Sequence, residues 1–247
     1  MTAKSASRPT RAMVLAAGFG LRLRPITDKL PKPLVEVGGR TLIDRALDRL
    51  EDAGIERAVV NTHYLAESVE RHLAGRKHPA VEVSREDELL ETGGGVLRAL
   101  DRLGPAPFFV VNSDIAWLDG PKPTLQRLAG TWDDKRMDAL LLVNPAARTD
   151  DYEGPGDYFM TPGGRLRRRK RGEIAPFVFC GVQILHPRLF AGATPGRFSL
   201  NVLYDRAEQA GRLYAVVHDG VWYHIGTAAG LAHAQRELPR FRRRQQD

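Results

Sequence analysis

The sequence predicts a single α/β domain built on a mixed, mainly parallel central sheet flanked by helices. In the first half, short apolar runs alternate with stretches whose apolar residues recur at helical intervals, a pattern typical of parallel strands joined by helices. At 247 residues the chain is long enough to bury one sizeable core. Its composition, 43% hydrophobic and 27% charged, is that of an ordinary globular protein and excludes a disordered chain.

The alternation runs from residue 11 to residue 114. We expect strands at 11–17, 55–61, 81–84 and 107–114, and helices at 41–54, 65–75 and 94–104. The first helix has apolar residues at positions 42, 43, 46, 47 and 50 and ends at Gly54, as an amphipathic helix would.

The rhythm changes after Asp138. We expect strands at 139–145 and 176–185, a hairpin over 156–169 that turns at 162–164, and a pair of strands or one bent strand at 213–226. Helices are expected at 198–211 and from about Thr227. The second half should add strands to the same sheet and build a lid or pocket over its carboxyl edge.

The net charge of +7 comes from two short segments of the chain. The segments "RLRRRKR" (165–171) and "RFRRR" (240–244) carry six and four cations, so the rest of the chain sums to 7 − 6 − 4 = −3. These segments could contact RNA, an anionic membrane surface or an acidic partner, but a solvated hairpin edge and tail is the favoured interpretation. Aromatic residues do not interleave with the basic runs, so nucleic-acid and membrane partners are not expected.

The cysteine content and the apolar runs favour a cytoplasmic protein. Cys180 is the one cysteine, so no internal disulfide can form, and its apolar surroundings predict a small core residue. The longest apolar run, "APFVFCGVQIL", is too short to span a bilayer.

The stretch "LAAGFGLRLRPITDKLPKPL" (15–34) places a glycine loop between the first strand and the first helix. Such a loop lies at the carboxyl end of a parallel sheet, where these folds bind ligands. Gly18 and Gly20 would let backbone N–H groups approach an anion. A dinucleotide fingerprint needs a third glycine where Leu23 stands, and a P-loop needs Gly-Lys-Ser/Thr, which does not occur. The loop instead offers Arg22 and then Lys32, between two prolines that would keep it extended; both cations suit a polyphosphate.

Two further segments point to the same chemistry. "LLETGGGVLRAL" (89–100) places three glycines at the start of a helix, which suits backbone contact with a base or ribose. "FFVVNSDIAW" (108–117) ends a buried strand with Asn112, Ser113 and Asp114. A carboxylate at the carboxyl end of a central strand, opposite a phosphate loop, is well placed to bind Mg²⁺.

With these motifs the chain resembles the sugar-1-phosphate nucleotidyltransferases. "LAAGFGLRLRPIT" followed by "KPLVEVGGRTLIDRAL" is similar to the family signature, and the likeness extends along most of the chain. The resemblance implies a Rossmann-like nucleotide-diphospho-sugar transferase fold and the joining of a nucleoside triphosphate to a sugar 1-phosphate, with release of pyrophosphate. It divides the chain into a flexible tail (1–10), one domain (11–239) with a nucleotide-binding half (about 11–145) and a sugar-binding half (about 146–239), and a basic tail (240–247).

The resemblance also implies the roles of individual residues. Arg22 would hold the β- and γ-phosphates, Lys32 would act on the α-phosphate, and Asp114 would bind the metal. The implied nucleotide-binding residues are Ala16, Ala17, Gly18, Gly20, Arg22, Lys32, Thr92, Gly93, Gly94 and Asn112.

The chain departs from the family pattern at "GVWYHIGTAAGL" (220–231), where His224 stands in the place of the second metal-binding aspartate. The resemblance implies Mg²⁺ as the cofactor. Imidazole is a poor ligand for Mg²⁺ and a better one for Mn²⁺, so Mn²⁺ is the alternative. Three interpretations of the metal site remain: His224 contacts the metal or a phosphate, Asp219 takes over, or the metal is held by Asp114, water and the nucleotide. The last two are favoured over direct coordination of Mg²⁺ by His224. The alternative to all three is a purely structural histidine, hydrogen-bonded in the pocket wall.

Within the family, the chain looks most like the N-acetylmuramate 1-phosphate uridylyltransferases of cell-wall sugar recycling. The likeness implies a sugar pocket that draws on Asp157, Gly181, Ser199 and Asn201, with a nearby cation for a lactyl carboxylate. Mannose-1-phosphate guanylyltransferase is the alternative, and a nucleotide-sensing relative with little turnover is a non-enzymatic one. The expected partners are the small-molecule substrates, in a monomer or a homodimer.

Overall fold

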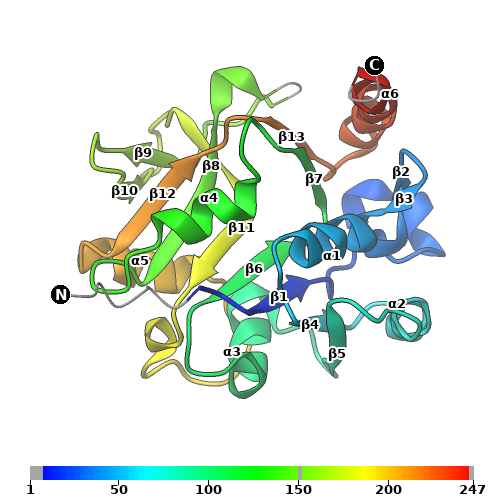
Figure 1. Ribbon diagram of the computed structural model, residues 1–247, viewed down its shortest axis with the longest axis horizontal. Coiled ribbons are helices and arrows are strands. Elements are labelled where there is room, and N and C mark those ends of the chain that lie inside the picture. The colour runs from blue at the N-terminus through cyan, green and yellow to red at the C-terminus, as the bar shows by residue number, and fades with distance from the viewer. Residues whose placement is uncertain (1–7, 150–151, 245–247) are drawn as a thin grey trace.

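The computed structural model describes residues 8–149 and 152–244, with side chains to Leu238 (Figure 1). Most of the expected N-terminal tail (1–7) and the last residues (245–247) of the expected basic tail lie outside the described part. Residues 240–244 continue the last helix, α6 (Ala228–Arg244), instead of starting a tail there.

The described residues form a nine-stranded central sheet. Its strands are β1 (Arg11–Leu15), β4 (Arg57–Thr62), β5 (Ala80–Arg85), β6 (Phe108–Asn112), β8 (Ala139–Pro145), β9 (Tyr158–Met160), β10 (Leu166–Arg168), β11 (Phe177–Leu185) and β12 (Leu213–Val217). Strands β6, β1, β4 and β5 are parallel neighbours, which confirms the mainly parallel sheet. The second half adds its strands to this same sheet, as predicted.

Strand β11 joins the two halves of the sheet. It runs antiparallel to β6 on one side and to β8 on the other, although it follows both in the chain. Its pairing with β8 is interrupted between Phe179 and Gln183, where Gly181 has a φ of +76°. A bulge of this kind bends a strand, and here it lies beside the end of β6.

Helices cover both faces of the sheet, with one apolar cluster under each face. Helices α1 (Leu42–Asp52), α2 (Ala66–Leu73) and α4 (Thr124–Thr131) pack on one face, and α3 (Glu91–Leu103) and α5 (Asn201–Gln209) pack on the other (Figure 1). All of these helices except α4 are predicted by the apolar periodicity of the sequence. Cys180 is fully buried in this core, as expected, and burial raises the pKa of its thiol.

Two short ribbons stand outside the central sheet. Strand β7 (Ile115–Leu118) pairs with β13 (Val221–His224), and β2 (Glu36–Val37) pairs with β3 (Arg40–Thr41). The region 213–226 is therefore two strands in two different sheets, and β7 is a strand that the sequence analysis does not anticipate. The ribbons and α6 share a third apolar cluster, which holds β13 beside the end of β6.

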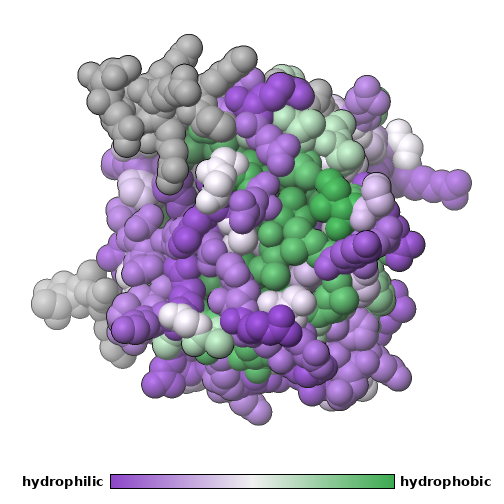
Figure 2. Space-filling view, turned by 90° about the vertical axis from the view of Figure 1, so that its right-hand side faces the viewer, coloured by the Kyte–Doolittle hydropathy of each residue, from purple (hydrophilic) through white to green (hydrophobic). Residues whose placement is uncertain are grey.

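Figure 2 shows a hydrophobic area on the face that carries α2, β2 and β3. The glycine loop and the segment after it contribute exposed apolar side chains, Phe19, Leu21, Ile26 and Leu30. Among the described residues, no helix combines the length and the hydrophobicity that a membrane crossing requires.

Candidate active site

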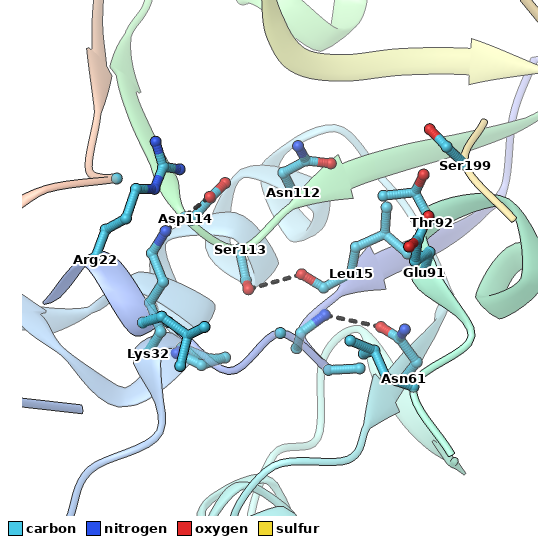
Figure 3. A pocket seen from close by; sticks show the side chains of 18 residues that line it. Leu15, Arg22, Lys32, Asn61, Glu91, Thr92, Asn112, Ser113, Asp114 and Ser199 are labelled. Atoms are coloured by element: carbon cyan, nitrogen blue, oxygen red, sulfur yellow. Dashed lines mark hydrogen bonds and ion pairs between the residues drawn. The ribbon is translucent and has the colours of Figure 1, made fainter. Parts of the chain in front are cut away.

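A cavity of about 560 Å³ opens at the carboxyl ends of the parallel strands β1, β4 and β6. Its wall is formed by Leu15, Ala16, Ala17, Gly18, Gly20, Leu21, Arg22, Lys32, Pro33, Asn61, Leu89, Glu91, Thr92, Asn112, Ser113, Asp114, Ser199 and Gly226. Figure 3 shows Arg22, Lys32 and Asp114 at one end of the cavity and Glu91, Thr92 and Ser199 at the other. Both cations of the wall lie at one end, so the anionic part of a ligand fits there.

The two glycines of the loop differ in backbone conformation and in their surroundings. Gly20 has a φ of +65°, and a Cβ there would lie 3.0 Å from Lys32 Cβ and from Thr27 Cγ2. The Thr27 hydroxyl donates to Gly20 O at 2.8 Å, so the loop is folded back on the segment that carries Lys32. A Cβ on Gly18, in contrast, would meet nothing within 4 Å, so Gly18 leaves open space in the cavity wall.

Lys32 and Asp114 form the central ion pair of the site. Lys32 Nζ lies 2.8 Å from Asp114 Oδ2, and the residue is only 9% exposed. Burial raises the pKa of the Asp114 carboxyl, but the charge and hydrogen bond of Lys32 outweigh burial, so the pKa is lowered and the group is a carboxylate at neutral pH. Lys32 itself opens a short 3-10 helix, η3 (Lys32–Leu34), which corrects the expectation of an extended backbone. The Val35 amide donates to Lys32 O and closes this turn.

Arg22 and His224 flank the ion pair. Arg22 has no carboxylate within ion-pair distance among the described residues, and the residue is exposed. A Cβ on Gly226 would collide with His224 and lie 3.0 Å from Arg22 Nη2, so Gly226 allows both side chains to approach this edge of the cavity. Partial burial lowers the pKa of His224, and Lys32 and Arg22 lower it further against the opposing charge of Asp114. The imidazole is therefore neutral at neutral pH.

The two alternatives for a second metal ligand lie at opposite ends of the β7–β13 ribbon. His224 pairs with Ile115, next to Asp114, whereas Val221 pairs with Leu118 at the far end. Asp219 lies beyond that far end and is held by Arg127. The structure therefore brings His224, and not Asp219, to Asp114. Within the described residues no group of three or more His, Cys, Asp and Glu side chains gathers to hold a metal ion.

A buried hydrogen-bonded pair, Asn61 and Glu86, holds the start of the glycine loop. Asn61 Oδ1 accepts from the Ala16 amide, and Asn61 Nδ2 donates to Glu86 Oε1, each at 2.8 Å. Glu86 Oε2 accepts from the Leu90 amide at 2.9 Å. The sequence analysis misses these residues. The available signal is that Asn61 ends the strand expected at 55–61 in "AVVN", just as Asn112 follows "FVV" in the strand expected at 107–114.

Asn112 lies between the two ends of the cavity (Figure 3). Its Oδ1 is buried without a hydrogen-bond partner among the described residues. Gly181, predicted to bind the sugar, lies against it, since a Cβ on Gly181 would be 3.1 Å from Asn112 Cβ and Nδ2. A buried acceptor without a partner is costly, and a ligand hydroxyl or N–H in the cavity would satisfy it.

The glycines at the start of α3 serve packing. Gly93 N and Gly94 N both donate to Phe198 O, at 2.9 and 3.2 Å, and neither residue lines the cavity. Added Cβ atoms would collide with the Phe198 ring and with Gly196 O. Of the residues predicted here, Thr92 reaches the cavity, and its hydroxyl also accepts from the Leu200 amide at 2.9 Å. The amides of Gly93 and Gly94 are therefore engaged within the protein, and their contact with a nucleotide stays a prediction.

Three of the four residues predicted to bind the sugar line a cavity, whereas Gly181 lies behind Asn112. Ser199 lines the cavity described above, and Asp157 and Asn201 line a second one of about 910 Å³. Asp157 Oδ2 accepts from the Phe179 amide at 2.9 Å. Ser199 and Asn201 are two residues apart in the chain, so the two cavities are neighbours.

A parallel sheet with a glycine loop, a lysine and a carboxylate at its carboxyl edge defines a nucleotide-handling enzyme of the α/β class. Residues 11–152 match the family described as "Nucleotidyl transferase". The chain belongs to this nucleotidyl transferase family. Within it, relatives and fold identify the chain as a sugar-1-phosphate nucleotidyltransferase, as the resemblance predicts.

Similar proteins cover nearly the whole chain. An N-acetylmuramate alpha-1-phosphate uridylyltransferase of Caulobacter vibrioides is 42% identical over 93% of this chain and 97% of its own length. A protein of the same name from Neisseria meningitidis serogroup B is 33% identical over 91% of this chain and 96% of its own. The crystal structure of a UDP-glucose pyrophosphorylase with UDP-glucose has the same fold, with a TM-score of 0.80 and 17% identity, over 94% of this chain and 99% of that one.

Proposed function

We propose that the protein transfers a uridylyl group from UTP to N-acetylmuramate 1-phosphate, giving UDP-N-acetylmuramate and pyrophosphate, in the recycling of cell-wall sugars. The identity of the relatives supports the pair of substrates. The observation that carries the proposal is the arrangement of Lys32, Asp114 and the free guanidinium of Arg22 around one end of the cavity. Since the reaction consumes UTP, we propose that it takes place in the cytoplasm.

The reaction needs positioning and charge neutralisation more than covalent chemistry. A phosphate oxygen of the sugar 1-phosphate attacks the α-phosphorus of the nucleotide, and the bond from that phosphorus to pyrophosphate breaks. Lys32 Nζ supplies a buried positive charge where the α-phosphate gains charge, and Arg22 binds the departing β- and γ-phosphates in a fork of N–H donors. Gly18 and Gly20 let the backbone of the loop come close to the same phosphates.

We propose Asp114 as the residue that holds a divalent ion, with Mg²⁺ preferred and Mn²⁺ as the alternative. The donor set fits Mg²⁺, which is commonly held by one or two carboxylates, substrate phosphates and water. When bound, the ion would neutralise charge on the phosphates and orient them. Asp114 is ionised through its pair with Lys32, so a carboxylate is available at neutral pH. His224, neutral and beside Asp114, would contact a phosphate or a bound water more readily than Mg²⁺.

A grid of assays tests the proposal. Pyrophosphate release would be measured from UTP, GTP, CTP, ATP and dTTP, each with N-acetylmuramate, mannose, glucose and N-acetylglucosamine 1-phosphates, in Mg²⁺ and again in Mn²⁺. We expect release with UTP and N-acetylmuramate 1-phosphate. Release confined to GTP and mannose 1-phosphate would identify the guanylyltransferase alternative instead, and no release with any pair would contradict the proposed reaction.

A further inference from the structure

The second cavity, of about 910 Å³, is bordered by the hairpin β9–β10, the segment that follows it and α5. Its wall is formed by Asp157, Tyr158, Arg168, Arg169, Lys170, Arg171, Phe179, Asn201, Asp205, Glu208 and Gln209. The basic run of the sequence therefore borders a cavity, and is more than a solvated hairpin edge.

Each acidic residue of this cavity accepts a hydrogen bond from the protein itself. Arg168 forms a two-pronged ion pair with Asp205, at 2.7 and 2.6 Å. Glu208 accepts from the Arg168 amide at 2.8 Å, and Asp157 accepts from the Phe179 amide. Asp157 and Glu208 accept from neutral amides and keep their charge, but the cavity wall carries three further cations besides Arg168, so its net charge is positive.

Arg169 is the cation whose side chain is held by the backbone. Its amide donates to Asp157 O at 2.9 Å, and its Nε donates to Gly156 O at 2.7 Å. Among the described residues its two terminal nitrogens have no hydrogen-bond partner and no carboxylate in ion-pair distance. Lys170 and Arg171 follow it, are exposed, and likewise have no ion pair within the described part of the chain. A guanidinium that is fixed at Nε and open at both ends of its fork is prepared to bind a planar anion.

The second cavity adjoins the active site. Ser199 borders the first cavity and Asn201, two residues later, borders the second. The amide that Asp157 binds belongs to Phe179 of β11, and Gly181 of the same strand lies against Asn112 in the first cavity. A sugar whose phosphate lies near Lys32 can therefore extend its ring substituents toward Arg169.

We propose that Arg169, assisted by Lys170 and Arg171, binds the carboxylate of an acidic sugar 1-phosphate and so selects it over the neutral sugar. The inference rests on the proposed function and names the residue that recognises the acid. In N-acetylmuramate 1-phosphate the carboxylate belongs to the lactyl ether on carbon 3, away from the phosphate on carbon 1. N-acetylglucosamine 1-phosphate has the same ring and phosphate without that acid, so it leaves the fork of Arg169 without its anion.

The test compares these two sugar phosphates. Steady-state kinetics with UTP would be measured for the wild type, Arg169→Gln, Arg169→Lys and the control Arg165→Gln. Arg165 belongs to the same basic run and loses the same charge, but its side chain donates to Tyr214 outside the cavity. A charged hydrogen-bonded contact of this kind corresponds to roughly a ten- to hundredfold change in kcat/KM.

We expect Arg169→Gln to lower kcat/KM for N-acetylmuramate 1-phosphate by about that factor, mainly through KM, and to leave N-acetylglucosamine 1-phosphate within about twofold. Arg169→Lys should keep part of the preference, and Arg165→Gln should keep all of it. An equal loss on both sugars would assign Arg169 to the phosphate or to folding and would overturn the inference, as would an unchanged preference. A wild type that does not use the acidic sugar would overturn the proposed function as well, which separates the two failures. If Arg169→Gln does not fold, the exposed pair Lys170→Gln and Arg171→Gln is judged by the same comparison.

Discussion

Lys32 occupies a buried position that few lysines tolerate, and it does so because Asp114 pairs with it. Removal of the ammonium leaves the carboxylate without this partner and, in the proposed reaction, the α-phosphate without its cation. We expect Lys32→Ala to lower kcat by about 10²–10³, the usual effect of losing one donor to a transition state. The affinity for UTP, measured by calorimetry, should fall by less than about tenfold. A loss of affinity with an unchanged kcat would contradict the role given to Lys32.

His224 is the residue at which this chain departs from the pattern it resembles, and it stands beside Asp114. His224→Asp places a second carboxylate there. We expect the Mg²⁺ concentration for half-maximal activity to fall by about tenfold, equivalent to about 1.4 kcal/mol, and Mg²⁺ to raise the unfolding temperature more than in the wild type.

The matched control is His224→Asn, which has a similar size without the charge. It should show neither effect. If His224→Asp loses activity with every metal and gains no Mg²⁺-dependent stability, the histidine has a role of its own toward the substrate.

At the scale of the element, two alanine substitutions in the glycine loop should have different effects, one on stability and the other on nucleotide binding. Gly20 is in the left-handed region and packed against Lys32, whereas Gly18 faces open space. Gly20→Ala should lower the free energy of unfolding by roughly 1–2 kcal/mol, measured by urea denaturation. Gly18→Ala should change it by less than about 0.5 kcal/mol but raise the KM for the nucleotide, because the methyl group enters the cavity. Equal stability of the two variants would contradict this description of the loop.

The sequence predicts most elements and the charged end of the site, because both follow from local patterns. Apolar periodicity predicts the strands of the sheet and the helices that cover it. The position of Asp114 after a buried strand predicts that it lies next to the glycine loop. The pairing of β7 with β13 cannot be predicted in this way, because the two strands are distant in the chain and β7 is only four residues long. Consequently Asp219 and His224 are indistinguishable in the sequence, although they lie at opposite ends of that ribbon.

Glycine has several physical uses, and this limits sequence-based assignment of sites. The glycines at 93 and 94 resemble a ligand loop, but their amides donate to Phe198 O. The absence of side chains leaves room for the Phe198 ring beside Gly93 and for Gly196 O beside Gly94. The role of Asn61 depends likewise on a contact with Glu86 across neighbouring strands. Both facts require the packed structure.

At the scale of the whole molecule, β11 ties the two halves of the chain into one sheet. We therefore expect a single cooperative unfolding transition. Trp132 and Trp222 are both buried and belong to different halves, so variants in which Trp117 and one of these two are replaced report each half by fluorescence. Their urea midpoints should coincide with each other and with the loss of far-ultraviolet circular dichroism. Separate midpoints would show that the halves unfold independently.

The late position of β11 in the chain also bears on how the protein is made. During synthesis β6 and β8 leave the ribosome before the strand that lies between them, so each has an edge with unsatisfied backbone groups until Phe177–Leu185 follow. About 70 residues separate the ends of β6 and β11, which at about 5–20 residues per second is a wait of roughly 4–15 s. During that interval the cavity-lining ends of β1 and β6 are already synthesised, but β11 has not yet paired with β6. A chaperone that shields strand edges would therefore have its greatest effect on this protein between the emergence of Asn112 and that of Gly181.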